Sequence, residues 1–428
     1  MTKLLVMGLG YVGMPLARQA VAAGMDVTGC DISESRVRML NAGQSPIDDL
    51  TDDNIVEMLA AGFLATTPGS ISQRPDVMVI CVPTPLSETD GPDLAAVIAA
   101  AKTAGRLLKP GALVVLESTT YPGTTDDVVR PILEKASGRP RDAFRTRRRL
   151  SAGVDFYLAF SPERIDPGNP SYGFSNTPKV VGGITPACTE AAMAFYTQIC
   201  KEVVVARSAR EAEMAKLLEN TYRHVNIALV NEMAIFCHEM GIDLWDAIRC
   251  ASTKPFGFQP FYPGAGVGGH CIPIDPNYLS HEVKRTLGYP FRFVELAQEI
   301  NNRMPAYVVT RAAELLNQDT KPLNGSTVLL LGVTYKPDIK DQRESPAPHV
   351  ARRLIAQGAC VRFHDPLVEE WIVDGEKITR WQGNPVDLAI LLQAHSAYSD
   401  LTEIVSQASI LLDTTGRAAR LPRVSVLL

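Results

Sequence analysis

The stretch KLLVMGLGYVGMPLARQAVAAGMDVTGCD, residues 3–31, decides the fold of the first part of the chain. The apolar run from Lys3 to Met7 predicts a strand, and it leads directly into glycines at positions 8, 10 and 13. Residues 14–23 then have the pattern of a helix, and residues 25–30 predict a second strand. A strand, a glycine-rich turn, a helix and a strand in this order form a βαβ unit, from which parallel sheets are built.

The glycines belong to the pattern GLGYVG at positions 8–13. Such a loop turns tightly after a strand, and the N–H groups at the start of the next helix face the phosphate oxygens of a ligand. Asp31 ends the second strand, where a carboxylate can accept hydrogen bonds from both hydroxyls of a ribose. The pattern therefore predicts a dinucleotide site formed by Gly8, Gly10, Tyr11, Val12, Gly13 and Asp31.

Asp31 also predicts which dinucleotide binds. Its negative charge would repel the 2′-phosphate of NADP, so we predict NAD as the cofactor. Arg36 stands nearby in the sequence and leaves NADP as the less favoured alternative, since a guanidinium attracts phosphate. With NAD bound, we expect Arg36 to pack on the adenine.

Two polar segments follow apolar strands further along the chain. CVPTP at 81–85 follows a strand predicted at 77–82, and ESTTYPGTT at 117–125 follows one predicted at 113–117. Pro83, Thr84 and Thr119 are therefore expected at the carboxyl edge of the sheet, where ligands bind in this architecture. The alternative is ordinary turn chemistry, because Pro and Thr are common in turns.

The remaining pattern predicts an α/β chain of three domains. Further strands are expected at 156–159, 180–182, 203–205, 328–331, 361–364, 388–392 and 410–412, and long helices at 208–240 and 293–318. We predict two Rossmann-like, doubly wound parallel sheets joined by a helical core with one long central helix. The expected domains are an NAD-binding domain at 1–206, a helical core at 207–318 and a second Rossmann-like domain at 319–428.

Net charge and hydrophobic content indicate which kinds of partner the protein binds. The 428 residues carry a formal charge of −5 and are 46% hydrophobic, which favours an enzyme with large cores over a nucleic-acid-binding or membrane-surface protein. No secretory signal or bilayer-spanning run stands out, so a cytoplasmic location is expected. The eight cysteines stand singly, without CxxC pairs, and no metal site is predicted. The arginine-rich segment 139–149 predicts a solvated loop; anion binding or partner docking is the alternative.

The run GAGVGGHCIPIDP, residues 264–276, places a thiol among glycines. Without side chains at these glycines, a bulky substrate can approach the sulfur of Cys271, and His270 and Asp275 could supply polar contacts. We therefore predict Cys271 as a nucleophile. Together with a hydride-accepting cofactor, a covalent trap for an aldehyde indicates oxidation to the acid.

Charged residues mark three further candidate sites. Lys216, Asn220 and Arg223 are spaced to share one face of the long helix, which predicts the lining of a cleft; a solvated face is the alternative. In FSPERIDPGN at 160–169, Glu163 and Arg164 follow a strand, where a simple salt bridge is the alternative. In GVTYKPDIKDQRESP at 332–346, the expected anion contacts are Lys336 and Arg343.

In order and spacing, these motifs resemble the nucleotide-sugar 6-dehydrogenases, which act on UDP-glucose, UDP-N-acetylglucosamine or UDP-N-acetylmannosamine. GLGYVG, VPTP, ESTTYPGTT, FSPERIDPGN, LLEN at 217–220, GVGGHCIPIDP and YKPDIKDQRESP carry the resemblance over nearly the whole chain. It implies a four-electron oxidation: NAD accepts a hydride from the C6 alcohol, Cys271 traps the aldehyde, a second hydride transfer leaves a thioester, and water releases a uronic acid. It also implies a homodimer through the long helix.

The resemblance assigns roles residue by residue. The implied catalytic residues are Cys271, Lys216 for proton transfer, Asn220, Asp275 and Thr119 for holding the substrate oxygen or a water, and Glu163 for thioester hydrolysis. Thr119 and Arg343 are implied as cofactor contacts beside Pro83 and Thr84. The implied substrate contacts are Glu163, Arg164, Ile165, Lys216, Asn220, Arg223, Phe256, Phe258, Phe261, Tyr262, Gly264, Gly268, Tyr335 and Lys336.

The substrate and two other classes of function stay open. GVGGHC at 266–271 and STKPFGFQPFYPG at 252–264 resemble the UDP-N-acetylglucosamine branch, while Ala265 departs from it, and UDP- or TDP-glucose remains an alternative. A two-electron dehydrogenase of the β-hydroxyacid type also joins a Rossmann domain to helices, but has no use for Cys271. A non-catalytic, NAD-bound assembly protein is the third alternative.

Overall fold

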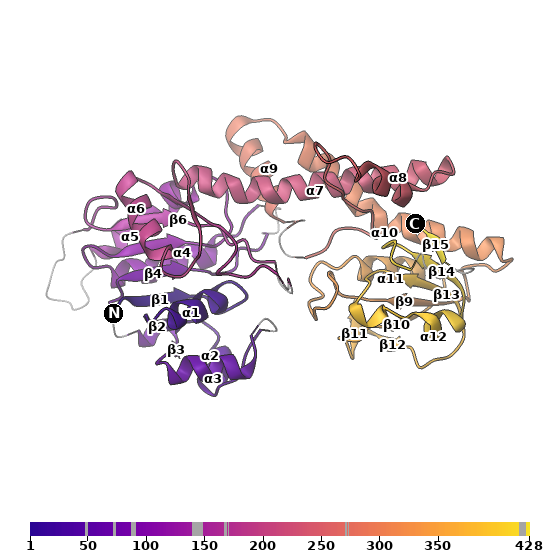
Figure 1. Ribbon diagram of the computed structural model, residues 1–428, viewed down its shortest axis with the longest axis horizontal. Helices are drawn as coiled ribbons and strands as arrows, with labels where there is room; N and C mark the ends of the chain where they lie inside the picture. Colours follow the sequence, from indigo (N-terminus) through magenta and orange to yellow (C-terminus); the bar gives the residue numbers. More distant parts are fainter. Residues whose placement is uncertain are drawn as a thin grey trace. The chain divides into compact units, whose positions relative to one another are not determined.

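The computed structural model (Figure 1) describes residues 1–47, 50–71, 74–86, 91–138, 149–166, 169, 171–269, 272, 274–418 and 425–428. The chain forms two compact units. The first consists of Met1–Glu219 and Asn277–Thr286, and the second of Asn220–Pro276 and Leu287–Leu428. The three-domain division expected from the sequence stays a prediction. The nucleophile candidate Cys271, its neighbour His270 and the arginine-rich stretch 139–148 lie outside the described residues.

An eight-stranded sheet forms the centre of the first unit, in the order β3-β2-β1-β4-β5-β6-β7-β8. Its strands are β1 Lys3–Met7, β2 Asp26–Cys30, β3 Leu64–Thr66, β4 Val77–Ile80, β5 Leu113–Leu116, β6 Tyr157–Phe160, β7 Lys179–Gly183 and β8 Val203–Val205. All neighbours pair in parallel except β6 and β7. The strand order reverses between β1 and β4: β2 and β3 extend the sheet on one side of β1, and β4 to β8 extend it on the other. In doubly wound sheets, ligands bind at the carboxyl ends of the strands at such a reversal.

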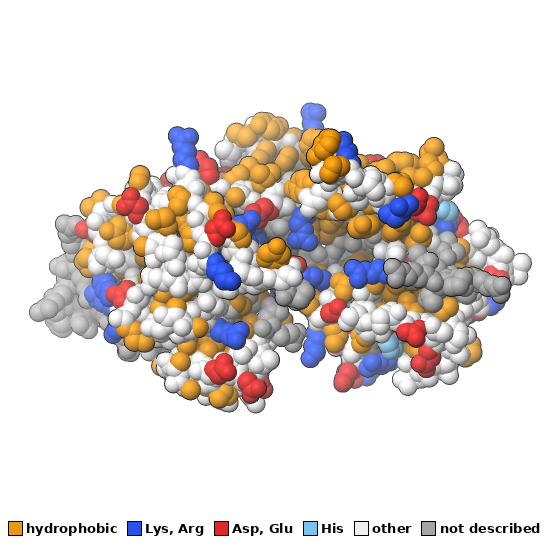
Figure 2. All heavy atoms as spheres, in the orientation of Figure 1, with side chains coloured by type: hydrophobic (Ala, Val, Ile, Leu, Met, Phe, Trp, Pro, Cys, Tyr) orange, Lys and Arg blue, Asp and Glu red, His pale blue; other side chains and the backbone are white. Residues whose placement is uncertain are grey.

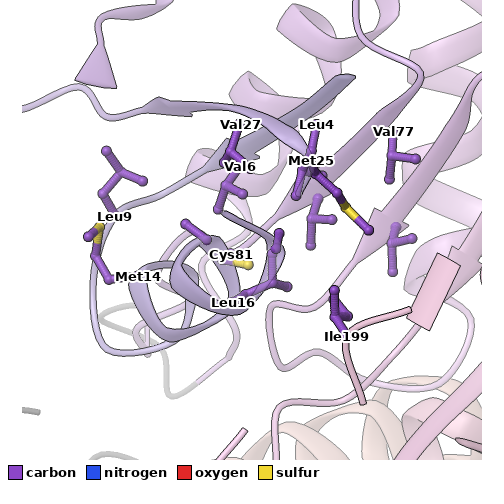
Figure 3. Packing of buried hydrophobic residues seen from close by; sticks show 14 of the residues in the cluster. Leu4, Val6, Leu9, Met14, Leu16, Met25, Val27, Val77, Cys81 and Ile199 are labelled. Carbon is purple, nitrogen blue, oxygen red and sulfur yellow. The ribbon is translucent and has the colours of Figure 1, made fainter. Parts of the chain in front are cut away.

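Helices cover both faces of this sheet. They are α1 Gly13–Ala22, α2 Glu34–Asn41, α3 Asp52–Ala60, α4 Ala95–Leu107, α5 Arg130–Ser137 and α6 Pro186–Tyr196, with the 3-10 turn η1 Pro68–Ser70 and the π-helical turn η2 Thr124–Val129. Alternate residues of β1 enter two different cores: Leu4 and Val6 belong to one, Leu5 and Met7 to the other. Figure 3 shows side chains of β1, β2 and α1 meeting in the first of these cores. Burial on both faces explains why β4 and β5 are apolar throughout.

The second unit contains a seven-stranded sheet in the order β11-β12-β10-β9-β13-β14-β15. The strands are β9 Thr327–Leu331, β10 Cys360–His364, β11 Trp371–Val373, β12 Glu376–Arg380, β13 Val386–Leu391, β14 Ala408–Asp413 and β15 Ser425–Leu427. Among the described residues of this sheet, β11 and β12 pair antiparallel and the other neighbours pair in parallel. Helices α11 Ala347–Ala356 and α12 Thr402–Ser406 and the turn η3 Ser396–Tyr398 connect these strands.

The described residues in the middle of the sequence form the helices α7 Ala209–Glu239, α8 Leu244–Ala251, α9 Asp275–Leu287 and α10 Arg292–Gln318. With 31 residues, α7 is about 46 Å long, and the boundary between the two units falls inside it. Within the described part of the chain, no helix has both the length and the apolar character needed to cross a membrane.

The predicted fold class is confirmed, including both parallel-dominated sheets and the long helix. Between α8 and α9 in the sequence, the described residues of 252–274 form no helix. Five glycines and four prolines in this segment disfavour one. The short strands β3, β11, β12 and β15 were not expected.

Candidate active site

The glycine loop between β1 and α1 has the shape that a phosphate-binding turn requires. Gly8 has a φ of +97°, and any side chain there would collide with the carbonyl of Cys81. A side chain at Gly13 would collide with the carbonyl of Gly8, so this glycine lets α1 approach the strand closely. In contrast, a Cβ at Gly10 would meet none of the described residues within 4 Å, apart from the two chain neighbours of Gly10. The loop thus combines tight packing inside with open backbone outside, where Gly10, Tyr11 and Val12 are part-exposed.

Asp31, at the end of β2, is buried and strongly bound. Its Oδ2 accepts a hydrogen bond from the Leu9 N–H and its Oδ1 from the Ser33 N–H, both at 2.9 Å. Arg36 donates from Nη1 to Oδ2 at 3.0 Å. The expected packing of Arg36 on adenine stays a prediction, because without a ligand its guanidinium pairs with this carboxylate.

The structure brings together the two predicted threonines of the strand ends. The Thr84 hydroxyl donates to the Thr119 carbonyl at 2.9 Å. Tyr278 of α9, which sequence reasoning missed, donates from its hydroxyl to the Thr84 carbonyl although 194 residues separate them. Pro83 is exposed beside them. The carboxyl edges of β4 and β5 are therefore held in one polar cluster, as their places in the sheet predicted.

Lys216 and Glu163 form a nearly buried ion pair in the first unit. Their Nζ and Oε2 atoms are 3.4 Å apart, and the side chains are 7% and 12% exposed. Glu163 also accepts a hydrogen bond from the Ile165 N–H. The solvated-face alternative is thus excluded for Lys216. A lysine in a dry setting can donate a proton as the ammonium and accept one from a bound alcohol as the neutral amine.

The neighbouring Arg164 points to a different partner. It pairs with Glu219 of α7 at 2.7 Å and donates to the Pro178 carbonyl at 2.8 Å. This arginine therefore connects the loop after β6 to the long helix.

A buried polar network, which sequence reasoning missed, lies at the ends of β5 and β7. Lys179 pairs with Glu117 at 2.8 Å, and the Tyr196 hydroxyl donates to the same carboxylate. Burial, and then the charge of Glu117, raises the pKa of Tyr196 well above its ordinary value. Burial likewise raises the pKa of the Cys81 thiol. Neither group ionises near neutral pH, so the network supports the strand ends and does not supply a nucleophile.

In the second unit, Asn220 donates to Asp275 at 2.5 Å, and both side chains are buried. Asp275 is the first residue of α9, where a carboxylate is stabilised by the helix dipole. Arg223 is exposed, so the three residues predicted on one face of α7 do not share one environment. Asn220 and Asp275 form a polar pair that could orient a water or a substrate hydroxyl.

The glycine loop before Cys271 packs against the segment after β9. A Cβ at Gly268 would lie 2.7 Å from the Glu344 carbonyl, and one at Gly269 would lie 2.7 Å from the Tyr335 ring. The Gly269 N–H donates to the Arg343 carbonyl at 3.2 Å. Gly268 and Gly269 thus allow this close packing. The sequence predicts that the glycines give a substrate access to the sulfur of Cys271. A Cβ at Gly264 would lie 4.0 Å from the Gly266 carbonyl, an ordinary contact, and the Gly264 N–H donates to Asn231 at 3.0 Å.

The other predicted substrate contacts are spread over this unit. Phe256, Phe258 and Tyr262 are exposed, and Phe261 packs edge-on against Tyr222 with ring centroids 5.7 Å apart. Tyr335 and Lys336 follow β9 and are part-exposed. Arg343 pairs with Asp341 at 2.5 Å and is exposed. Among the described residues, no group of three His, Cys, Asp or Glu side chains could hold a metal ion.

Comparisons with known proteins identify what these elements belong to. Three sequence models of one family match consecutive parts of the chain: the NAD-binding domain of the UDP-glucose/GDP-mannose dehydrogenase family at residues 2–200, its central domain at 210–303 and its UDP-binding domain at 329–419. The chain belongs to the UDP-glucose/GDP-mannose dehydrogenase family.

Relatives of this dehydrogenase match over nearly their full length. The chain is 35% identical over 409 residues to a UDP-N-acetyl-D-glucosamine 6-dehydrogenase of Pseudomonas aeruginosa, covering 93% of this chain and 92% of the relative. The structure of a UDP-D-ManNAc dehydrogenase from Pyrococcus horikoshii superimposes with a TM-score of 0.88 at 31% identity, covering 99% of this chain and 98% of that one. A UDP-glucose dehydrogenase from Pyrobaculum islandicum gives a TM-score of 0.84 at 26% identity, covering 99% of this chain and 97% of that one.

This family membership confirms the resemblance seen in the sequence. The chain is an NAD-dependent nucleotide-sugar dehydrogenase, with NAD bound by the first Rossmann domain and the nucleotide sugar by the UDP-binding domain. Its glycine loop and Asp31 fit NAD, because an open backbone and a strand-end carboxylate are what pyrophosphate and ribose require.

Proposed function

We propose that this dehydrogenase oxidises the C6 hydroxymethyl group of a UDP-linked N-acetylhexosamine to the uronic acid, in two successive two-electron steps. The relatives from Pseudomonas aeruginosa and Pyrococcus horikoshii, and a UDP-N-acetyl-D-mannosamine dehydrogenase of Methanocaldococcus jannaschii that is 33% identical, support an N-acetylated sugar. UDP- or TDP-glucose is the alternative substrate. The observation that carries the proposal is the nearly buried Lys216–Glu163 pair, which supplies a proton-transferring group on α7.

NAD, when bound, accepts the hydride that leaves C6. As the neutral amine, Lys216 takes up the proton of the C6 hydroxyl. The ammonium formed in this way pairs with Glu163 and stabilises negative charge developing on the C6 oxygen. Asn220 stands one helical turn further along α7, and with Asp275 it orients the substrate oxygen or a water. Thr119, fixed by Thr84, has the same role at the strand ends.

The second oxidation step depends on a covalent adduct. The Cys271 thiolate adds to the aldehyde carbon, and the carbonyl oxygen takes up a proton to give a thiohemiacetal. Loss of hydride from that carbon and of the hydroxyl proton leaves a thioester. Water, activated by Glu163 acting as a base, attacks the thioester, releasing the uronic acid and regenerating the thiol. The balance is one water consumed and two NAD reduced for each sugar.

The stoichiometry of NADH tests this scheme. With a panel of UDP-, TDP- and GDP-sugars at limiting concentration, we expect two NADH per sugar and the largest kcat/KM for a UDP-N-acetylhexosamine. One NADH per sugar with an aldehyde product would instead identify a two-electron dehydrogenase. No NADH with any sugar, despite measurable NAD binding, would favour the non-catalytic assembly protein.

Cys271→Ser provides the sharper test of the covalent step. We expect this variant to bind NAD and substrate but to release no uronic acid, because serine is a far weaker nucleophile than a thiolate. Cys250→Ser is the matched control, since this cysteine is exposed and lies outside the proposed machinery. Acid production by Cys271→Ser at the unaltered rate would contradict the scheme.

We also infer that two copies associate through α7. Tyr222, Leu229 and Phe236 are spaced by seven residues, so they form one stripe on this helix, and they are 47%, 54% and 43% exposed. Figure 2 shows apolar side chains over α7 and α8 on the face that it presents. A stripe of large apolar side chains left in water is costly, and a second copy of the helix offers a complementary apolar surface.

A further inference from the structure

The second sheet repeats the ligand-binding turn of the first sheet. Gly8 and Gly332 both have positive φ, and each donates its N–H to the last residue of the neighbouring strand, to Cys30 at 2.8 Å and to His364 at 3.0 Å. Asp365 follows β10 as Asp31 follows β2, and it accepts from the Val333 and Leu367 N–H groups, both at 2.8 Å. The turn that presents a carboxylate to a ribose is therefore built twice.

The two carboxylates have different partners. Asp31 is paired with Arg36, a side chain that is 39% exposed and can move away when a ligand arrives. Asp365 is paired with His395, and both side chains are fully buried, with Nε2 and Oδ2 3.0 Å apart. The imidazole of His395, from the loop after β13, thus occupies the carboxylate of Asp365. Asp365 therefore cannot accept hydrogen bonds from a ribose in the way that Asp31 can.

The hydrogen bonds of His395 determine which nitrogen carries the proton. The backbone N–H of Asp338 lies 2.9 Å from Nδ1 and can only donate, so Nδ1 accepts. Nε2 therefore carries the proton and donates a hydrogen bond to Asp365. The Thr334 hydroxyl lies 3.3 Å from the same nitrogen. One ring thus connects the carboxylate on one side to the loop after β9 on the other.

This loop carries Tyr335 and Lys336, the proposed nucleotide-sugar contacts. Its conformation is held by side chains: the Thr334 hydroxyl donates to the Lys336 carbonyl at 2.9 Å, and Gln393 donates to the Tyr335 carbonyl at 2.9 Å. Asp338 has a φ of +62°, which is unfavourable for a residue with a Cβ and needs outside support. Two groups supply that support: His395 accepts from the Asp338 N–H, and the Ser396 N–H and hydroxyl donate to Asp338 Oδ1 at 2.7 and 2.9 Å.

We propose that His395 is a positioning residue for the nucleotide sugar: Nδ1 fixes the turn at Asp338, and thereby the Tyr335–Lys336 segment, while Nε2 satisfies the buried carboxylate of Asp365. This role rests on the proposed function, in which the second sheet binds the nucleotide. It separates two tasks, substrate positioning by Nδ1 and stability by Nε2, and the two can be tested apart.

The experiment uses two substitutions that each keep one half of the ring. An Asn oxygen can occupy the place of Nδ1 and accept from Asp338, whereas a Gln amide can occupy the place of Nε2 and donate to Asp365. We measure the Kd of UDP by calorimetry, the KM of the sugar substrate, the Kd of NAD and the Tm for H395N, H395Q and H395A. His349→Gln, at an exposed histidine of α11, is the matched control.

We expect the two properties to diverge. H395N should bind UDP within about twofold of the unaltered protein but melt lower, while H395Q should melt higher than H395N yet bind UDP about three- to tenfold more weakly, the effect of one lost hydrogen bond. The sugar KM should follow UDP affinity, and NAD affinity should not change. UDP affinity that follows the order of Tm, or that is unchanged in all variants, would overturn the role. If the unaltered protein binds NAD but neither UDP nor its sugars, the proposed function itself fails.

Discussion

Glu213 of α7 accepts two hydrogen bonds from Thr125, from the backbone N–H at 2.8 Å and from the hydroxyl at 2.7 Å. It also accepts from the Gly123 N–H at 2.5 Å, so one buried carboxylate holds the start of the π-helical turn η2. The same loop carries Thr119, and Lys216 lies one helical turn after Glu213. This carboxylate therefore connects the strand-end loop to the helix that bears the proposed proton-transferring lysine.

The first prediction concerns the pH dependence of stability. Burial raises the pKa of Glu213 from 4.5 to about 7, so ionisation costs more in the folded than in the unfolded chain. The contribution of Glu213 to stability is thus fully present below pH 4.5 and is lost as the pH rises to about 7, a loss of about 3 kcal/mol. Glu213→Gln cannot ionise, so its unfolding free energy relative to the unaltered protein should rise by about this amount between pH 4.5 and 7.5.

Urea unfolding followed by circular dichroism at both pH values measures this difference. Glu211→Gln is the matched control on the same helical turn. Glu211 is exposed, and its hydrogen bond to Ser208 lowers its pKa, so its variant should show no such rise. A constant difference between Glu213→Gln and the unaltered protein would show that the carboxylate stays ionised throughout.

The second prediction concerns Lys216. Lys216→Met should lose on the order of a hundredfold in kcat, because it removes the amine that takes up the hydroxyl proton and, with it, the ammonium that then stabilises the C6 oxygen. NAD affinity should be unchanged, since the glycine loop and Asp31 do not contact Lys216. Steady-state kinetics and calorimetry measure the two, with the exposed Lys201→Met as control. A kcat within about threefold of the unaltered enzyme would reduce the Lys216–Glu163 pair to a structural salt bridge.

The third prediction concerns the choice of cofactor. Asp31→Ala removes the ribose acceptor and at the same time releases Arg36, whose guanidinium can then attract a 2′-phosphate. The ratio of kcat/KM for NAD to that for NADP should fall at least about tenfold. The double variant Asp31→Ala with Arg36→Ala should recover part of the preference, and Asp26→Ala, at the other end of β2, should change nothing. An unaltered ratio in Asp31→Ala would place the discrimination elsewhere.

The fourth prediction concerns assembly. Leu229→Glu puts a charge into the apolar stripe of α7, so the protein should elute at half the mass of the unaltered dimer in light scattering coupled to size exclusion. Val204→Glu is the control, because Val204 is also an exposed apolar residue, 42% exposed, but stands on the edge strand β8. The inference fails if the unaltered protein is monomeric at micromolar concentration or if both variants dissociate equally.

The sequence alone determined the fold class and the site elements that depend on local pattern. The pattern GLGYVG followed by Asp31 predicts the turn between β1 and α1. This is possible because the backbone atoms that exclude a side chain at Gly8 and Gly13 belong to the same Rossmann fold. Apolar runs predict strands that are buried on both faces, and they identified β1, β4 and β9 within a few residues. Threonines after two such strands were expected at one edge, and Thr84 indeed contacts Thr119.

Only the tertiary structure decided which distant groups complete these elements. Tyr278 reaches Thr84 across 194 residues, Glu213 reaches Thr125 across 88 and His395 reaches Asp365 across 30. No local periodicity encodes such pairs, because a buried hydrogen bond depends on where the whole chain places donor and acceptor, and a polar residue on an apolar helix has the same sequence pattern whether it faces water or a partner. The fold supplies the desolvation that makes each of these contacts significant.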